Sequence, residues 1–299
     1  VDLGKVMVDG KLDSAQQLLA LSFNSGFIVF SMSTQLIVYQ INLSQAPDAL
    51  DWDSEGNVWL AYFDGTSGNS RRAIEYNQFG ATGFQTDMIP SGFIAFEILQ
   101  NDEITFSSMD SYTHVYGQDG SFIRKLSQSN TYLTYSYEDS EENFFVGSSS
   151  GKLYRYNTTT WSSTSLDLGV NEKISHISQL NNSSYFVGTE EGTVFIVGSS
   201  PFVVQDFISI SKAVTGVYRE FGGQISVFGT FNSFTEIYYF DLDSDLDGTP
   251  DSVDVFPTDS TQDTDFDGDG YGDNLSGVNG DAFPLDSSQN IDSDGDGYG

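Results

Sequence analysis

Aspartates in residues 241–299 carry the most specific chemical pattern of the sequence. This segment contains 17 Asp and 9 Gly, and it contains no Glu, Lys, Arg, His or Cys. The pattern Asp-x-Asp-x-Asp-Gly begins three times, at Asp243, Asp265 and Asp292, and the second interval is longer than the first. Further Asp residues follow the first two copies, whereas the third copy reaches the last residue of the sequence. We therefore expect the chain to be a piece of a longer polypeptide.

Three carboxylates at alternate positions of a tight loop are typical of a site for a hard cation. Carboxylates at positions 1, 3 and 5 direct their oxygens to one centre, and Gly at position 6 permits a sharp turn. Position 7, which is Thr249 or Tyr271, can add a backbone carbonyl, and position 9 adds another carboxylate. Oxygen ligands without His or Cys suit Ca²⁺ rather than zinc or copper. The segment therefore predicts calcium sites.

The surroundings of these loops differ from those of an EF-hand or a dockerin. Asp254 stands at position 12, where an EF-hand has Glu, and Pro250, Pro257 and Pro284 argue against flanking helices. The segment instead resembles thrombospondin type 3 repeats, in the Cys-free form common in prokaryotic surface and secreted proteins. That resemblance implies a mostly irregular chain that depends on calcium and winds around the ions held by its motif carboxylates.

The resemblance assigns calcium to thirteen aspartates, and the third site is incomplete in this sequence. The expected ligands are Asp243, Asp245, Asp247, Asp251, Asp254, Asp265, Asp267, Asp269, Asp273, Asp281, Asp292, Asp294 and Asp296. The alternative is a disordered acidic linker without specific metal sites.

Residues 1–240 read as a succession of short strands. Runs of aromatic and β-branched residues alternate with clusters of Gly, Asn, Asp and Ser. No window keeps a helical spacing for long; Asp13–Leu21 comes nearest, and it is short enough to be a strand. Phe144–Tyr156 matches Tyr185–Val197 as a strand, a Gly-containing turn and a second strand. We expect an all-β fold.

Looser copies of this strand-turn-strand unit reveal a repeat. They begin near Phe27, Val58, Ile104 and Ile225. With the two copies above, most steps are close to one length, although the first step is shorter and the step from Val58 to Ile104 is longer. That length is about 40 positions, and a period near 40 with four short strands is the spacing of a β-propeller blade. The repeat therefore predicts a β-propeller of about six or seven four-stranded blades. A two-sheet β-sandwich is the alternative.

A generic family resemblance supports the propeller. Ala49–Leu60 looks like the strand-turn-strand of WD-repeat, quinoprotein-like and two-component-regulator propellers. Neither the Gly-His and Trp-Asp signature of WD repeats nor a sialidase Asp box is present. The resemblance implies a propeller domain over residues 1–240, followed by the calcium-binding repeats of residues 241–299.

The charge of the chain excludes several classes of partner. The sequence has 43 acidic and 11 basic residues, a formal charge of −32, and 26 acids with all 11 bases leave −15 on residues 1–240. Nucleic-acid binding needs clustered Lys and Arg, and docking on an anionic membrane is disfavoured for the same reason. No apolar run approaches the length of about 18 residues that suggests a membrane span. Without Cys, the chain has no disulfide, thiolate metal site or Cys nucleophile.

Residues 1–240 show no recognisable catalytic or cofactor-binding motif. His114 and His176 fall on expected strands, and we interpret them as structural. The pairs Glu141–Glu142 and Glu190–Glu191 fall beside expected turns, which favours solvated loop charges over the acid pair of a glycosidase. Arg71–Arg72 is interpreted as a surface pair.

Together these features predict a secreted or cell-surface protein. The propeller would be a binding or scaffolding platform for a protein or glycan, and a calcium-stiffened acidic stalk would join it to further segments. All-Asp sites bind weakly, so millimolar extracellular calcium suits them better than cytosolic calcium. The alternative is an extracellular propeller enzyme, a polysaccharide hydrolase or lyase, with catalytic residues on loops over the central channel. Acids gathered with Tyr, His or Arg at one mouth of the channel would favour the enzyme.

Overall fold

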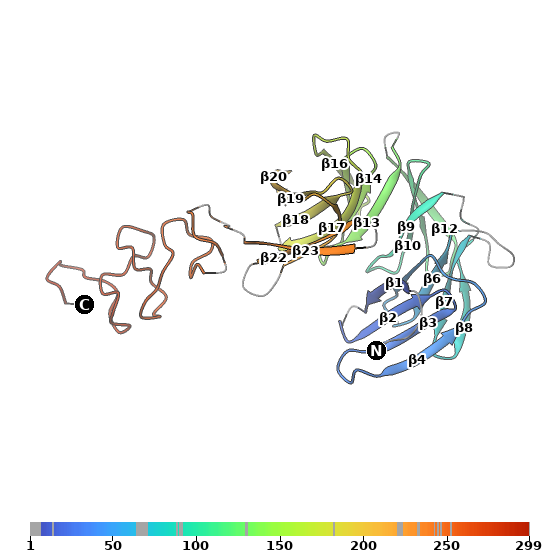
Figure 1. The fold of residues 1–299 in the computed structure, drawn as a ribbon, viewed down its shortest axis with the longest axis horizontal. Coiled ribbons are helices and arrows are strands. Elements are labelled where there is room, and N and C mark those ends of the chain that lie inside the picture. The colour runs from blue at the N-terminus through green and yellow to red at the C-terminus, as the bar shows by residue number, and fades with distance from the viewer. Residues whose placement is uncertain are drawn as a thin grey trace. The chain divides into compact units, whose positions relative to one another are not determined.

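The chain is built of β-strands and turns, and no helix occurs among the residues that the structure describes (Figure 1). The structure is a computed structural model, and it describes residues 7–298 apart from 14, 64–70, 88, 90–91, 129–130, 182, 220–223, 232–233, 242, 244, 246 and 252. Within those residues, no helix is long and apolar enough to cross a membrane. The all-β prediction is confirmed.

The strands form six separate sheets, each made of strands that are consecutive in the chain. The first three sheets comprise β1 (Met7–Leu12), β2 (Leu18–Phe23), β3 (Gly26–Ser31) and β4 (Ile37–Asn42); β5 (Ala49–Trp52), β6 (Val58–Tyr62), β7 (Arg72–Asn77) and β8 (Gly80–Gln85); and β9 (Phe93–Ile98), β10 (Ile104–Ser108), β11 (Tyr112–Tyr116) and β12 (Phe122–Ser127). The next three comprise β13 (Leu133–Glu138), β14 (Asn143–Ser148), β15 (Lys152–Asn157) and β16 (Ser163–Asp167); β17 (Ile174–Asn181), β18 (Ser184–Thr189), β19 (Thr193–Ser199) and β20 (Phe202–Ser209); and β21 (Ala213–Arg219), β22 (Gln224–Phe231) and β23 (Phe234–Asp241). Over the described residues, five sheets therefore have four strands and the sixth has three.

The first strand of each sheet contacts the first strand of the next, so the sheets are the blades of a propeller. Contacts join β1 to β5, β5 to β9, β9 to β13, and β13 to β17. Hydroxyl groups continue this ring: Thr134 Oγ1 donates to the carbonyl of Ile174, and Ser175 Oγ donates to the carbonyl of Val214, each at 2.6 Å. The fold is a six-bladed β-propeller. The β-sandwich alternative is wrong, because the strands pair into six small sheets rather than two large ones.

Burial falls from the second strand of a blade to its outer edge. Every residue of β6, β10 and β18 is buried, whereas β4 and β12 alternate between exposed and half-buried residues. Aromatic rings fill the space between neighbouring blades; the rings of Phe145 and Tyr185, for example, lie 4.5 Å apart between centroids. A strand buried on both faces is rich in apolar residues, as β6 is, although β10 also buries Thr105, Ser107 and Ser108.

The observed blades correct one feature of the predicted repeat. Five of the six anchors lie on second strands, but Phe27 lies on β3, the third strand of its blade. The equivalent second strand is β2, and its start at Leu18 lies one full period before Val58. The long step from Val58 to Ile104 has a different cause, because the connection between β6 and β7 is longer than the corresponding connections in other blades. The near-helical stretch Asp13–Leu21 ends in a strand, β2.

The chain divides into two compact units, residues 1–214 and 215–299. The first unit holds five complete blades and the start of β21, and the second holds the rest of the sixth blade and the Asp-rich segment. After β23 ends at Asp241, the described residues form turns and bends, with one isolated bridge between Gly272 and Gly280. The mostly irregular character expected for this segment is observed.

Candidate metal centre

Each Asp-x-Asp-x-Asp-Gly copy folds into the same loop, which its own backbone N–H groups hold together. The Asp at position 1 accepts from the N–H of the Gly at position 6 at 3.0, 2.8 and 2.9 Å in the three copies. The Asp at position 3 accepts from the N–H of position 5 at 3.3, 3.2 and 3.3 Å. The Asp at position 5 accepts from the N–H of position 7 at 2.7, 2.9 and 3.0 Å. The repeat in the sequence is therefore a repeat in geometry.

The Gly at position 6 is required by the backbone of this loop. Gly248, Gly270 and Gly297 have φ angles of 102°, 90° and 83°, a region that residues with a Cβ seldom adopt. The space around each of the three is open, so the constraint is the backbone conformation and not a close neighbour. With the turn made, the chain folds back and aims the carboxylates at positions 1, 3 and 5 inward.

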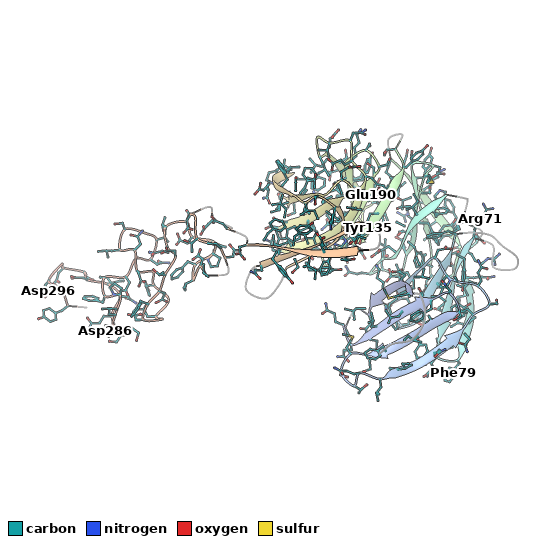
Figure 2. All side chains as sticks on the ribbon, in the orientation of Figure 1. Arg71, Phe79, Tyr135, Glu190, Asp286 and Asp296 are labelled. Carbon is teal, nitrogen blue, oxygen red and sulfur yellow. The ribbon has the colours of Figure 1, made fainter. Side chains whose placement is uncertain are left out.

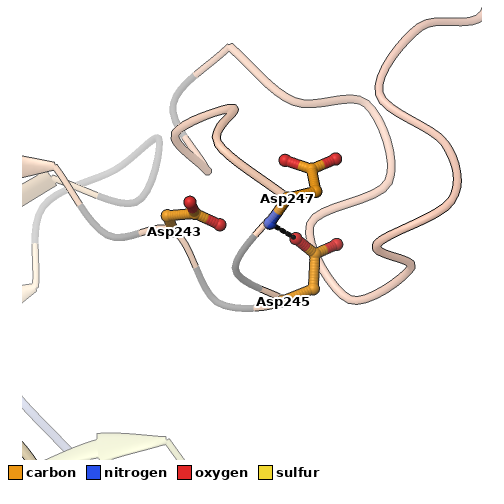
Figure 3. Close-up of side chains that lie close together, drawn as sticks. All are labelled: Asp243, Asp245 and Asp247. Atoms are coloured by element: carbon orange, nitrogen blue, oxygen red, sulfur yellow. Dashed lines mark hydrogen bonds between the residues drawn. The ribbon is translucent and has the colours of Figure 1, made fainter.

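The three carboxylates of each copy come together as predicted from their spacing. One oxygen from each of Asp243, Asp245 and Asp247 lies within 4.8 Å of the others (Figure 3). The same limit holds for the second copy and the third, which consist of Asp265, Asp267 and Asp269, and of Asp292, Asp294 and Asp296. Like charges held this close repel one another, so each cluster favours a cation at its centre.

A fourth carboxylate joins each of the first two clusters. Asp254 and Asp281 are 9% and 2% exposed, and each is followed by x-Phe-Pro in the sequence. Their Oδ1 atoms accept from the N–H groups of Phe256 and Phe283 at 2.7 and 2.8 Å. Burial, together with the charges of neighbouring carboxylates, raises the pKa of Asp245 and of Asp267. The charge of Asp254 contributes to the raised pKa of Asp245, and the charge of Asp281 contributes to that of Asp267.

Several carboxylate oxygens in these two clusters are buried without a hydrogen-bond partner among the described residues. In the first cluster they are Asp243 Oδ1, Asp245 Oδ2 and Asp254 Oδ2, and in the second they are Asp267 Oδ2, Asp269 Oδ2 and Asp281 Oδ2. Buried polar atoms are nearly always paired, so such a group points to an absent partner. Hard anionic oxygens that converge without donors match the preference of Ca²⁺. The residues present fit a calcium ion in both clusters.

The second cluster reaches its fourth carboxylate through a longer loop. Asp281 lies much further along the chain from Asp273 than Asp254 does from Asp251. The extra loop folds over Gln262, which is 2% exposed. The side-chain amide of Gln262 donates to the carbonyls of residues 274 and 278 at 2.8 and 3.1 Å. With the loop closed in this way, the Asp281 N–H donates to the carbonyl of residue 272 at 2.8 Å, and the charge of Asp281 lies beside Asp267 as that of Asp254 lies beside Asp245.

Among the described residues, neither Asp251 nor Asp273 belongs to a group of three converging carboxylates. Asp251 is buried at 8% exposure, and Asp273 accepts from the Phe266 N–H through Oδ1 at 3.1 Å. The third cluster, Asp292 to Asp296, is more exposed and is not followed by another Asp-x-Phe-Pro in this sequence. The motif Asp-x-Phe-Pro occurs at both Asp254 and Asp281, so the sequence marks them as equivalent residues, but only the folded loop brings Asp281 to its cluster.

The histidines and acid pairs of the propeller lie where the strand assignments place them. His114 on β11 is 5% exposed, and burial lowers its pKa, although Asp110 lies 3.7 Å from its Nε2. His176 on β17 shares a hydrogen bond of 3.3 Å between Nδ1 and the hydroxyl of Tyr135, which Figure 2 labels. The pairs Glu141–Glu142 and Glu190–Glu191 lie in the turns before β14 and β19. Arg71 directly precedes β7, and residues 64–70 of its loop lie outside the described residues.

A structural pair of aspartates in the propeller was not recognised from the sequence. Asp53 and Asp139 each hold a hairpin turn by accepting from backbone N–H groups and from the side-chain amide of an Asn further along the turn. Each also accepts from an aromatic side chain. Asp53 accepts from Trp59 Nε1 at 3.0 Å, and Asp139 accepts from the Tyr185 hydroxyl at 2.6 Å. The signal was present as Asp-Ser-Glu-x-Asn, which occurs at both turns.

The propeller also contains a concave site, called the acidic pocket here. It has a volume of about 460 Å³, and its lining comes from the ends of β1, β5, β9 and β13 and from the turns that follow β5, β9 and β13. Six of its fourteen lining residues are Asp or Glu, and one is Lys. Because blades are related by rotation about the axis, these strand ends lie on one face of the propeller.

Comparisons with known proteins support the propeller fold but do not assign the chain to a family. No protein-family model matches the sequence, and no curated protein matches it. Among solved structures, the chain is similar to the WD40 repeats of RRP9, with 10% identity and a TM-score of 0.62 over 75% of this chain and 74% of that one. It is similar to U3-55K, with 10% identity and a TM-score of 0.61 over 75% of both chains. It is also similar to the computationally designed Ika8 protein, with 12% identity and a TM-score of 0.61 over 79% of this chain and 71% of that one.

Proposed function

We propose that this chain is a calcium-binding protein of the cell surface or the extracellular space. Its propeller serves as a binding platform for a protein or glycan, and its Asp-rich segment is a stalk that calcium makes rigid. The observation that carries the proposal is the pair of clusters in which three aspartates converge, with a fourth nearby, and leave buried oxygens without donors in the described part of the chain. The resemblance of the Asp-rich segment to thrombospondin type 3 repeats also implies calcium binding, and we propose that the segment is such a repeat.

The ligand chemistry supports calcium and an extracellular setting. Each cluster offers flexible, anionic, hard oxygens, to which backbone carbonyls and water can add up to the six to eight ligands of Ca²⁺. Asp side chains are short, and one oxygen of each loop carboxylate at positions 3 and 5 already accepts from the loop backbone. We therefore expect weak sites, which fill at millimolar calcium outside the cell and remain mostly empty in the cytosol.

Titration calorimetry of the full chain with calcium tests the metal sites. We expect at least two ions per chain. The double variant Asp267→Asn, Asp269→Asn should lose one ion, because it removes two unpartnered oxygens from one cluster. The matched control is Asp259→Asn, Asp286→Asn, which changes two Asp side chains that only accept from residues in their own turns. Absence of binding at millimolar calcium would favour the acidic linker, and surface labelling of intact cells that express the full-length protein would test the compartment.

The enzyme alternative has one observation in its favour. The acidic pocket gathers acids with Lys11 on one face of the propeller, and burial raises the pKa of Glu138 in this pocket to about 7. A carboxyl group with such a pKa could act as a general acid. Turnover of a soluble polysaccharide by the full chain, abolished in Glu138→Gln, would establish the enzyme and replace the platform. We expect no turnover, because most acids of the pocket are engaged by the protein itself.

A further inference from the structure

The acidic pocket contains one internal ammonium group, and two of its acids hold that group. Lys11 Nζ on β1 lies 3.0 Å from Glu97 Oε1 on β9 and 3.6 Å from Asp51 Oδ2 on β5. The two carboxylates are 12% and 10% exposed at their side chains and Lys11 is 36% exposed, so a partly exposed ammonium neutralises two nearly buried acids. Burial opposes the charge of Lys11, but Asp51 and Glu97 overcome this effect and raise its pKa above the ordinary value.

Three further acids of the pocket are satisfied by donors of the turns around it. Asp53 and Asp139 hold hairpins, as described above. Asp102 accepts from the backbone N–H of Ser54 at 2.8 Å and from its hydroxyl at 2.6 Å. These three carboxylates therefore have donors of their own within the chain.

Glu138, at the end of β13, is the acid of the pocket that lacks a full set of partners. Its Oε2 accepts from the backbone N–H of Gln100 at 2.6 Å. Its Oε1 is buried without a hydrogen-bond partner among the described residues. Burial raises the pKa of Glu138, and the nearby Thr158 hydroxyl opposes this rise only weakly, since it donates to the carbonyl of Glu142 at 3.1 Å. Asp139 and Glu142 place further negative charge beside Glu138.

We propose that the acidic pocket binds a primary ammonium group, such as a lysine side chain of a partner protein, with Glu138 Oε1 as its anchor. This inference rests on the platform half of the proposed function and names the chemistry of its partner. Lys11 on β1 satisfies Asp51 on β5 and Glu97 on β9. Glu138 on β13, in the next blade, lacks an equivalent cation in the described part of the chain. An external ammonium would complete the pattern that the pocket already shows.

The geometry favours an ammonium over other ligands. An anionic ligand would face six acidic side chains and a single Lys. A divalent metal needs several converging oxygens, and the described propeller residues contain no group of three metal-ligating side chains of the kind seen in the Asp-rich segment. A guanidinium fork prefers two free oxygens of one carboxylate, but Glu138 has one oxygen engaged by Gln100. A compact ammonium needs only one strong acceptor and can use the remaining polar lining for its other protons.

Calorimetry on the full chain, saturated with calcium so that the Asp-rich segment does not attract the probe, tests this inference. The probes are acetyl-Gly-Lys-Gly-amide, the same peptide acetylated at Nε, and n-butylammonium. We expect the lysine peptide to bind and the acetylated peptide to bind at least tenfold more weakly. Peptide binding tighter than that of n-butylammonium indicates a partner's side chain as the natural ligand, and equal binding indicates a free amine; both outcomes support an ammonium site.

Glu138→Gln is the decisive variant, because its side-chain carbonyl can still accept from the Gln100 N–H while the charge is lost. We expect at least a tenfold loss of affinity with an unchanged circular dichroism spectrum. Glu191→Gln, at an exposed turn, removes the same charge elsewhere and should bind as the parent does. Equal binding by the parent and Glu138→Gln, or by the lysine and acetyl-lysine peptides, would overturn the inference. Calcium stoichiometry is measured separately, so failure here leaves the metal sites untouched.

Discussion

The propeller and the Asp-rich segment both rely on aspartates, but they satisfy these side chains in opposite ways. Asp139 in the propeller is 1% exposed and accepts from four donors supplied by the chain, one of them the hydroxyl of Tyr185. Asp281 in the Asp-rich segment is similarly buried, but its Oδ2 has no donor among the described residues. A carboxylate with donors from the chain stabilises a fold without an ion, whereas one without donors needs a cation.

The two regions also differ in what offsets the entropy of ordering the chain. The propeller buries aromatic and aliphatic side chains between its blades, so apolar burial drives its folding. The Asp-rich segment exposes most of its large apolar side chains, including Val253, Phe266 and Leu285 at 68%, 77% and 77%. Ordering costs about 1–2 kcal/mol per residue. We propose that metal binding provides much of the free energy that folds this segment.

Removal of calcium should produce the largest difference between the two regions. In excess chelator, we expect a non-specific protease to cut the Asp-rich segment rapidly, for example at residues 268–272, while the propeller remains intact. With millimolar calcium the same bonds should be protected. Gel analysis of the two digests measures this effect. Equal protection in both conditions would mean that the segment does not depend on calcium.

The loss of one internal carboxylate should destabilise the propeller by a large amount. Asp139→Ala leaves buried N–H and hydroxyl donors unpaired, and we expect a loss of about 3 kcal/mol in the free energy of unfolding, independent of calcium. Denaturant unfolding at fixed calcium concentration measures it. The control Asp119→Ala removes an exposed turn carboxylate and should leave the midpoint unchanged. A calcium-dependent loss in Asp139→Ala would contradict the proposed division of roles.

A single ligand change in the Asp-rich segment should have a smaller and local effect. Asp281→Asn removes the charge of the fourth carboxylate but preserves an acceptor for the Phe283 N–H. We expect the second site to bind calcium about tenfold more weakly, which corresponds to about 1.4 kcal/mol. Calorimetry measures this effect, with Asp286→Asn as the control. An unchanged affinity would show that Asp281 is not a ligand.

The smallest expected effect is a pH dependence in the propeller. The pKa of Glu138 is about 7 in the folded state, and about 4.3 is usual for an unfolded chain. Between these values the folded state binds more protons than the unfolded state, so this group lowers stability as pH rises from about 4 to about 7. Glu138→Gln should therefore gain a few degrees in Tm relative to the parent at pH 8 and show no gain at pH 4. A constant difference across this range would contradict the raised pKa.

The sequence by itself determined the features that depend on local spacing. Strand periodicity, turn residues and a regular blade-length period were sufficient for an all-β propeller, because each blade is built from strands that are consecutive in the chain. The Asp loops were equally local, since positions 1, 3 and 5 lie within one turn and Gly at position 6 closes it. Only the tertiary structure decided which distant groups meet. Lys11 and Glu97 lie on different blades, far apart in the chain, and Asp281 joins its cluster only because the preceding loop folds over Gln262. Such contacts depend on blade order and loop closure, which no short-range pattern records.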